Sequence, residues 1–112
     1  MRKDPKIFLA HIVESIELIE QYSHDKTQSR FLEERARQDA VIRRLEVIGE
    51  AVKGLPSFFR SKHSEIPWKQ MAGMRDILIH EYFDVDLVLT WRVVKHELGP
   101  IKLMLLELLL LE

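Results

Sequence analysis

Hydrophobic residues recur at intervals of three and four along most of this chain, the pattern of amphipathic helices that share one core. The first stripe follows Asp4-Pro5, a pair typical of a helix start, and consists of Leu9, Ile12, Ile16 and Ile19. No segment alternates like a β-strand, and we find neither an internal repeat nor a domain boundary. We therefore predict one all-α domain over residues 1–112, an up-and-down bundle of four main helices with a possible short additional helix.

A second helix is predicted from Ser29 to Lys53, after a polar loop over residues 22–29. Glycine, leucine and proline at positions 54–56 should end it. Its core stripe is Val41, Leu45, Ile48, Val52 and Leu55. Residues 56–66 should form a loop with at most one helical turn around Phe58-Phe59.

The third predicted helix opens at Pro67, and the last one is capped by Asp84 or Asp86. The third helix carries Trp68, Met71 and Met74. The last helix has the stripe Leu87, Trp91, Val94, Leu98, Ile101, Leu105 and Leu108. Proline inside a helix costs about 3 kcal/mol, but this stripe keeps its phase through Gly99-Pro100. We therefore expect a kink there rather than two unrelated helices, and we expect both tryptophans in the core.

Composition narrows the class of protein. Apolar residues make up 46% of the 112 residues, the net charge is -1, and cysteine is absent. Enough apolar surface is therefore available for one core, and disulfides and zinc–thiolate sites are excluded. Any basic surface must be local. The N-terminus lacks the features of a signal peptide, and the leucine-rich C-terminus is too short to span a bilayer. We expect a soluble, cytoplasmic protein without a membrane role.

The candidate chemistry lies in residues 75–82, Arg-Asp-Ile-Leu-Ile-His-Glu-Tyr. Arg75 is permanently charged and suits phosphate oxygens, whereas His80 has an ordinary pKa near ~6.5 and suits proton transfer. Asp76 lies four residues before His80, so the two can touch on a helix. Arg75 and His80 are about 140° apart on an ideal helix, so they converge only if the helix ends or distorts there, or if Arg75 wraps around. On spacing alone, an ion pair for Arg75, no task for His80 and a packing role for Tyr82 remain open.

The residues around this string resemble the HepT family of the HEPN superfamily, whose signature is R-x-x-x-x-H-x-Y. The resemblance rests on Ile66-Pro67-Trp68, residues 73–83, Val85-Asp86, Trp91 and the helix Arg44–Ala51. It implies a HEPN-like all-α homodimer that cleaves RNA without a metal or cofactor. Arg75 and His80 correspond to the family's catalytic pair. Asp76, where asparagine is common in the family, would assist.

The resemblance also implies a partner. HepT-like toxins are paired with a minimal nucleotidyltransferase antitoxin, MntA-like, in a type VII-like toxin–antitoxin system. The antitoxin transfers AMP onto the motif tyrosine, here Tyr82, and so inactivates the toxin. Cleavage by a 2′-hydroxyl needs both a base and an acid, yet one chain supplies one motif histidine. We therefore expect a composite site across a two-fold dimer interface.

A weaker candidate for RNA binding is a stripe of arginines that recur every seven residues, at Arg30, Arg37 and Arg44. Arg37 and Arg44 could hold RNA phosphates. Interleaved acidic residues favour the alternative of a solvated, salt-bridged face. The leucine-rich C-terminus should pack in the core or against a partner.

Two other functions remain open from the sequence. The chain could be a non-catalytic helical subunit that binds a nucleotidyltransferase and serves as its scaffold. It could also be a purely structural helical dimer in which Arg75 and His80 form salt bridges. Loss of toxicity in His80→Ala would separate the nuclease from both.

Overall fold

The computed structural model describes the backbone of residues 4–80 and 86–111 and the side chains of residues 4–74 and 86–111. In chain order its elements are α1 (Pro5–Ser23), α2 (Gln28–Glu33), α3 (Arg35–Gly54), α4 (Ser57–Lys62), α5 (Trp68–His80), α6 (Leu87–Arg92), the π-helical η1 (Val93–Glu97) and α7 (Leu98–Leu111). The segments α6, η1 and α7 follow one another without a gap. The described residues thus form four long helical segments and two short helices with no strand, which confirms the predicted all-α bundle.

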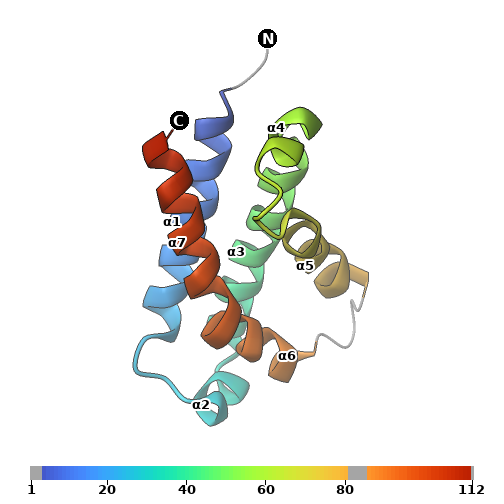
Figure 1. Ribbon diagram of the computed structural model, residues 1–112. Coiled ribbons are helices and arrows are strands. Elements are labelled where there is room, and N and C mark those ends of the chain that lie inside the picture. Colours follow the sequence, from blue (N-terminus) through green and yellow to red (C-terminus); the bar gives the residue numbers. More distant parts are fainter. Residues whose placement is uncertain (1–3, 81–85, 112) are drawn as a thin grey trace.

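The helices α1 and α3 pack against each other and form the centre of the bundle. α7 lies along α1, and α5 lies against α3 (Figure 1). The short helix α2 contacts both α3 and α6. The beginning of α1 and the end of α7 lie at the same end of the bundle (Figure 1). This arrangement makes α3 the support on which α5, the helix of the candidate site, rests.

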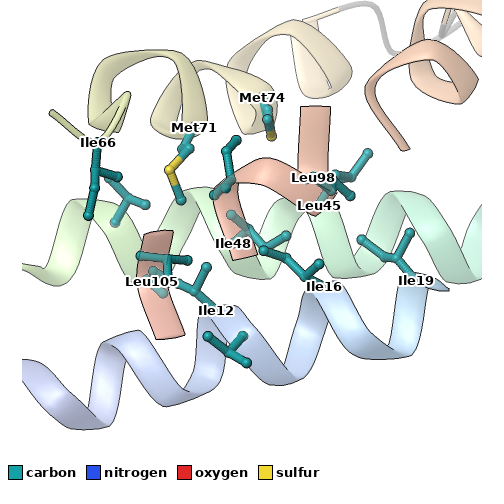
Figure 2. Packing of buried hydrophobic residues seen from close by; sticks show 14 of the residues in the cluster. Ile12, Ile16, Ile19, Leu45, Ile48, Ile66, Met71, Met74, Leu98 and Leu105 are labelled. Carbon is teal, nitrogen blue, oxygen red and sulfur yellow. The ribbon is translucent and has the colours of Figure 1, made fainter. Parts of the chain in front are cut away.

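The core is built from the predicted stripes. Side chains from α1, α3, α5 and α7 point into one shared interior in Figure 2. The buried residues of the four predicted stripes include Ile12, Ile16, Ile19, Val41, Leu45, Ile48, Met71, Leu98 and Leu105. Each such side chain contributes about 1.5–3 kcal/mol when it leaves water. Trp68 and Trp91 are also buried, each only 7% exposed, which confirms their expected place in the core.

Both helix starts that rest on aspartate are confirmed where the structure describes them. The Oδ1 atom of Asp4 accepts a hydrogen bond from the backbone N–H of Lys6 at 2.9 Å. Asp86 does the same for Leu89 at 3.0 Å, so Asp86 is the cap of α6. Each bond satisfies a donor that the first turn of a helix leaves unpaired. Asp84, the alternative cap, lies outside the described residues.

The prediction of one continuous helix from Ser29 to Lys53 is wrong in one respect, because the helix is interrupted at Glu34. Extended backbone at Glu34 separates α2 from α3, and α1 continues to Ser23, so the loop covers only residues 24–27. The Nε2 atom of Gln38 donates to the carbonyl oxygens of Phe31 at 2.9 Å and Leu32 at 3.1 Å. These bonds satisfy carbonyl groups at the end of α2 and so stabilise the break.

The short helix α4 replaces most of the loop that we expected over residues 56–66. It extends over six residues and buries Phe59, while Phe58 stays exposed. A single turn was expected around these two phenylalanines, and the structure forms somewhat more. Phe59 is the one side chain of this helix that is buried in the core.

The predicted irregularity around Gly99-Pro100 takes the form of a π-helical segment. η1 covers Val93 to Glu97, and the backbone N–H of Leu98 donates to the carbonyl of Val93, five residues back. Proline cannot donate to the ladder, and a wider turn just before Pro100 lets the helix continue past it. Trp91 before η1 and Leu98 after it are both buried, as expected for one irregular helix, whereas Leu87 at the start of the stripe is partly buried.

The leucine-rich C-terminal helix is only partly buried. Leu105 and Leu108 face the core, whereas Leu103 and Leu110 are 64% and 87% exposed. Within the described residues, no helix combines the length and the apolar character needed to cross a membrane.

Candidate functional site

The N-terminal end of α5 is anchored by Trp68. Its indole Nε1–H donates to the carbonyl oxygen of His63 at 2.9 Å, in the turn after α4. Its ring lies 6.4 Å from that of Phe59, centre to centre. Pro67 precedes Trp68, and the Pro67 carbonyl accepts the N–H of Met71 at 3.0 Å. The predicted Pro-Trp entry therefore fixes where α5 begins.

The middle of α5 is fixed by two buried methionines and one polar contact. Met71 and Met74 are buried in the shared core against α3. Gln70 donates from Nε2 to Oε1 of Glu97 in η1 at 2.8 Å. The helix is thus held from two sides up to the residue that precedes the motif.

Three predicted site residues occupy the last two turns of this anchored helix. Arg75, Asp76 and His80 belong to α5, whose backbone is helical through His80. Asp76 and His80 are one turn apart along the helix. Arg75 and His80 are separated by about 140° around the axis and about 7.5 Å along it. Their side chains lie outside the described part, as does all of Tyr82, so convergence on one phosphate stays a prediction.

The chain after the motif is also held to the bundle by packing and hydrogen bonds. α6 begins at the Asp86 cap, and Trp91 packs on Phe31 of α2 with ring centres 5.1 Å apart. Lys95 lies over the Trp91 ring at 4.8 Å and donates to the carbonyl of Ser23 at the end of α1, at 3.1 Å. The motif therefore connects two parts of the chain that are both fixed to the bundle.

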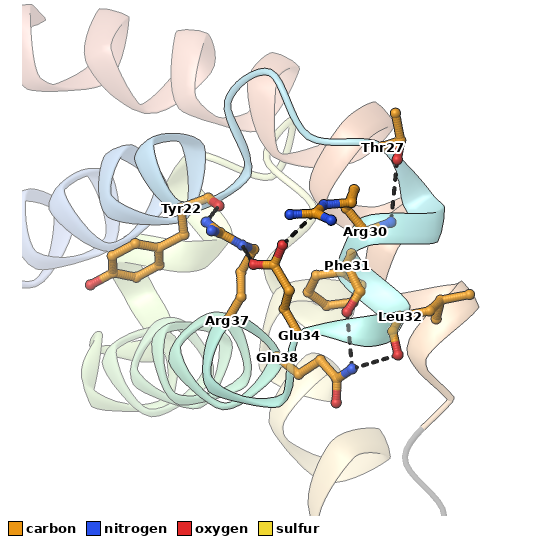
Figure 3. Close-up of polar contacts among 8 residues, drawn as sticks. All are labelled: Tyr22, Thr27, Arg30, Phe31, Leu32, Glu34, Arg37 and Gln38. Carbon is orange, nitrogen blue, oxygen red and sulfur yellow. Dashed lines mark hydrogen bonds and ion pairs between the residues drawn. The ribbon is translucent and has the colours of Figure 1, made fainter.

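Arg37, a predicted RNA contact, is engaged within the protein. Its Nε donates to Oε2 of Glu34 at 2.7 Å, and its Nη1 donates to the carbonyl oxygen of Tyr22 (Figure 3). Arg30 approaches Oε1 of the same glutamate at 3.4 Å. These contacts favour the salt-bridged alternative for the arginine stripe. Arg44 lies half-buried on α3, and its RNA contact stays a prediction.

The hydrogen bond from Arg37 changes the pKa of the Glu34 carboxyl. It lowers the pKa of the Glu34 carboxyl below its ordinary value, with the charges of Arg37, Arg30 and Lys26 acting in the same direction against partial burial. The lowered pKa means that the folded state holds Glu34 in its charged form. This arginine–glutamate group thus stabilises the α2–α3 junction.

A groove lies beside the first half of α5, and it was not predicted from the sequence. It has a volume of about 1150 Å³ and runs between α4, the end of α3 and α5. A usable signal existed, because Ser57, Arg60, Ser61 and Ser64 recur at spacings of three and four. That signal was hidden because residues 56–66 were expected to be mostly loop.

The described residues contain no cluster of three or more histidine or acidic side chains suited to a metal ion. The chain has no cysteine.

Comparison with known proteins places the chain in a family. The model of the HepT-like family, described as ribonuclease HepT-like, matches residues 12–108. The chain belongs to the HepT-like ribonuclease family, and the resemblance seen in the motif is confirmed.

Several relatives carry related names. A protein of Thermococcus cleftensis named as a probable ribonuclease HepT is 46% identical over 102 residues, 91% of this chain and 93% of that protein. An inferred RNase of Caldanaerobacter subterraneus is 40% identical over 107 residues, 96% of each chain.

A longer relative comes from Methanocaldococcus jannaschii. It is 58% identical over 109 residues, and its name describes a gamma-glutamylcyclotransferase and an inferred RNase. The match covers 97% of this chain but 49% of that protein, so the chain spans about half of its length. No solved structure matches the chain significantly.

Proposed function

We propose that this chain is the toxin of a two-component toxin–antitoxin pair and acts as a metal-independent endoribonuclease. The observation that carries the proposal is the position of the motif. Arg75, Asp76 and His80 lie on the last two turns of a helix that Trp68, Met71 and Met74 fix to the bundle. Membership of the HepT-like ribonuclease family supports the same reaction.

In the proposed reaction the 2′-hydroxyl of the RNA attacks the neighbouring phosphate. A base takes the hydroxyl proton, an acid protonates the leaving 5′-oxygen, and the product carries a 2′,3′-cyclic phosphate. His80 has the chemistry for either proton transfer. Arg75 would stabilise the charge that develops on the phosphorane oxygens. Asp76, one helical turn from His80, would fix the tautomer of the imidazole and raise its pKa.

The need for an acid and a base together supports a composite site. A two-fold dimer that brings two α5 helices near its axis would supply two histidines and two arginines to one cleft. Mixed dimers of wild type and His80→Ala test this arrangement. Cleavage should fall well below half of the wild-type rate per dimer, whereas full activity per wild-type motif would contradict a shared site.

Regulation is proposed at Tyr82. A phenol two residues after His80 could accept AMP from an MntA-like nucleotidyltransferase, forming a phosphodiester with loss of pyrophosphate from ATP. The added phosphate would compete with RNA for Arg75 and would repel its backbone. Incubation with antitoxin and ATP should add one or more AMP masses to wild type and none to Tyr82→Phe. Equal modification of the mutant would exclude Tyr82 as the acceptor.

The experiment that tests the core proposal is cleavage of RNA by the purified chain in excess chelator. Wild type should produce ends with 2′,3′-cyclic phosphate, and Arg75→Gln and His80→Ala should each lose at least about 100-fold, the contribution of one acid–base group. A folded, dimeric wild type that harms no cell and cuts no RNA would favour the non-catalytic scaffold instead.

A further inference from the structure

The groove between α4 and α5, here called the α4–α5 groove, has a lining surface that is mostly apolar, with Ile66, Pro67, Trp68 and Ala72 among its residues. Its polar lining includes three basic residues, Lys53, Arg60 and Lys69, and three serines, Ser57, Ser61 and Ser64. None of the described residues that line it is acidic. This is unusual for a chain with 18 acidic and 17 basic residues. A local concentration of cations and hydroxyl donors is the chemistry that binds phosphate oxygens.

Arg60 sets the groove apart from the other basic surfaces. Its Nε is buried and has no hydrogen-bond partner among the described residues. Leaving a buried donor unpaired costs about 1–3 kcal/mol. Because this Nε is closed off from solvent, a ligand in the groove can be bound only by the terminal nitrogens of the Arg60 guanidinium. By contrast, four arginines elsewhere pair with carboxylates, namely Arg30, Arg35, Arg37 and Arg43.

The serines place hydroxyl groups beside this guanidinium. Ser57 and Ser61 are one turn apart on α4, on the same side as Arg60. All three residues line the groove together with Ser64, which follows in the next turn. Hydroxyl and guanidinium donors on one wall can bond successive phosphates without reading the bases.

The opposite wall is the face of α5 that leads toward the motif. Lys69 and Gly73 line the groove, and they are one helical turn apart. Asp76 and His80 continue the same stripe of the helix at the next two turns, since residues 69, 73, 76 and 80 follow spacings of four, three and four. From Lys69 to His80 the helix rises by about 16 Å. A Cβ placed at Gly73 would meet no atom within 4 Å, so the groove is open at this point.

We propose that the α4–α5 groove binds the sugar–phosphate backbone of single-stranded RNA and leads the strand toward His80. This inference rests on the proposed ribonuclease function, and it assigns to Arg60, Lys69 and the serines the task of holding the strand away from the cleaved bond. Binding through phosphates is independent of sequence and depends strongly on salt.

The test is binding of a labelled single-stranded RNA of mixed sequence to the His80→Ala protein, which keeps the probe intact. Adding Arg60→Gln and Lys69→Gln should raise Kd about 10-fold or more. The salt dependence should also weaken by about 1.4 in log–log slope, since each lost phosphate contact removes about 0.7 on single strands. The matched control is Arg35→Gln with Arg43→Gln, an equal loss of charge at exposed positions of α3. It should change Kd less than about twofold.

Further variants test the groove even if one of the first variants does not fold. Lys69 is exposed, so Lys69→Gln alone tests the groove if Arg60→Gln fails to fold. Gly73→Glu adds a negative charge to the open wall and should weaken RNA binding, whereas Gly73→Ala should not. Groove variants that bind RNA as the control does, or a His80→Ala protein with no RNA affinity at low salt, would overturn the groove assignment. Intact groove-dependent binding with no cleavage by wild type would instead refute only the proposed ribonuclease function.

Discussion

The Nε of Arg37 lies 2.7 Å from Oε2 of Glu34, across the junction where α2 ends and α3 begins. The same guanidinium donates to the carbonyl oxygen of Tyr22 near the end of α1 (Figure 3). One side chain of α3, only 24% exposed, thus contacts both the end of α1 and the residue that joins α2 to α3.

Arg37 should therefore matter for stability more than its neighbours on α3. Arg37→Gln removes a charged bond to a partly buried partner and leaves the Tyr22 carbonyl without this donor, so we expect a loss of about 1.5 kcal/mol in the free energy of unfolding. Arg35→Gln breaks an exposed pair with Asp39 and should cost less than about 0.5 kcal/mol. Denaturant unfolding of the two variants checks this, and equal losses would contradict the structural role.

The same pair predicts a pH dependence. Because the pKa of Glu34 is lowered in the folded state, its stabilising contribution is complete above the ordinary glutamate pKa near ~4.3 and is lost as pH falls through the lowered value. The Tm of wild type should exceed that of Glu34→Gln at pH 7, and the difference should shrink below about pH 5. Thermal unfolding from pH 7 to pH 3 measures it. Glu33→Gln, an exposed neighbour, should show no such convergence.

Replacing each of two glycines with alanine should change the stability of the fold in opposite directions. A Cβ at Gly54 would lie 2.5 Å from Cε1 of Phe8, so Gly54→Ala must displace that ring and should destabilise the fold by about 1 kcal/mol. Gly73→Ala meets no atom within 4 Å and should stabilise α5 by up to about 1 kcal/mol through helix propensity. Chemical denaturation compares the pair. Adding Phe8→Leu to Gly54→Ala should recover part of the loss, and no recovery would exclude the clash.

The sequence predicted the long helices well because their cores follow one stripe each. Ile16, Leu45 and Leu105 are buried as the spacing required. The break at Glu34 could not be predicted in this way, because Phe31, Gln38 and Leu45 keep helical spacing straight through it. What ends α2 is a set of hydrogen bonds from Gln38 to the carbonyls of Phe31 and Leu32, and a periodic pattern of apolar residues contains no such information.

Part of the candidate site could likewise be predicted from the sequence, and part could not. The motif and its helix could be predicted from Pro67-Trp68 and from residues 75–82, and the structure places Arg75, Asp76 and His80 on α5. The α4–α5 groove depends on how α4 packs near α5, a tertiary relationship between residues that the sequence presents as loop. The unpaired Nε of Arg60 is likewise visible only once its surroundings are folded.

The most direct test of the account is the rate of RNA cleavage by wild type and His80→Ala in excess chelator, with both proteins shown to be folded by their Tm. We expect wild type to release fragments with 2′,3′-cyclic phosphate ends, and His80→Ala to lose at least about 100-fold in rate while keeping its affinity for RNA. Cleavage by His80→Ala at the wild-type rate, or wild-type cleavage that requires added magnesium, would contradict it.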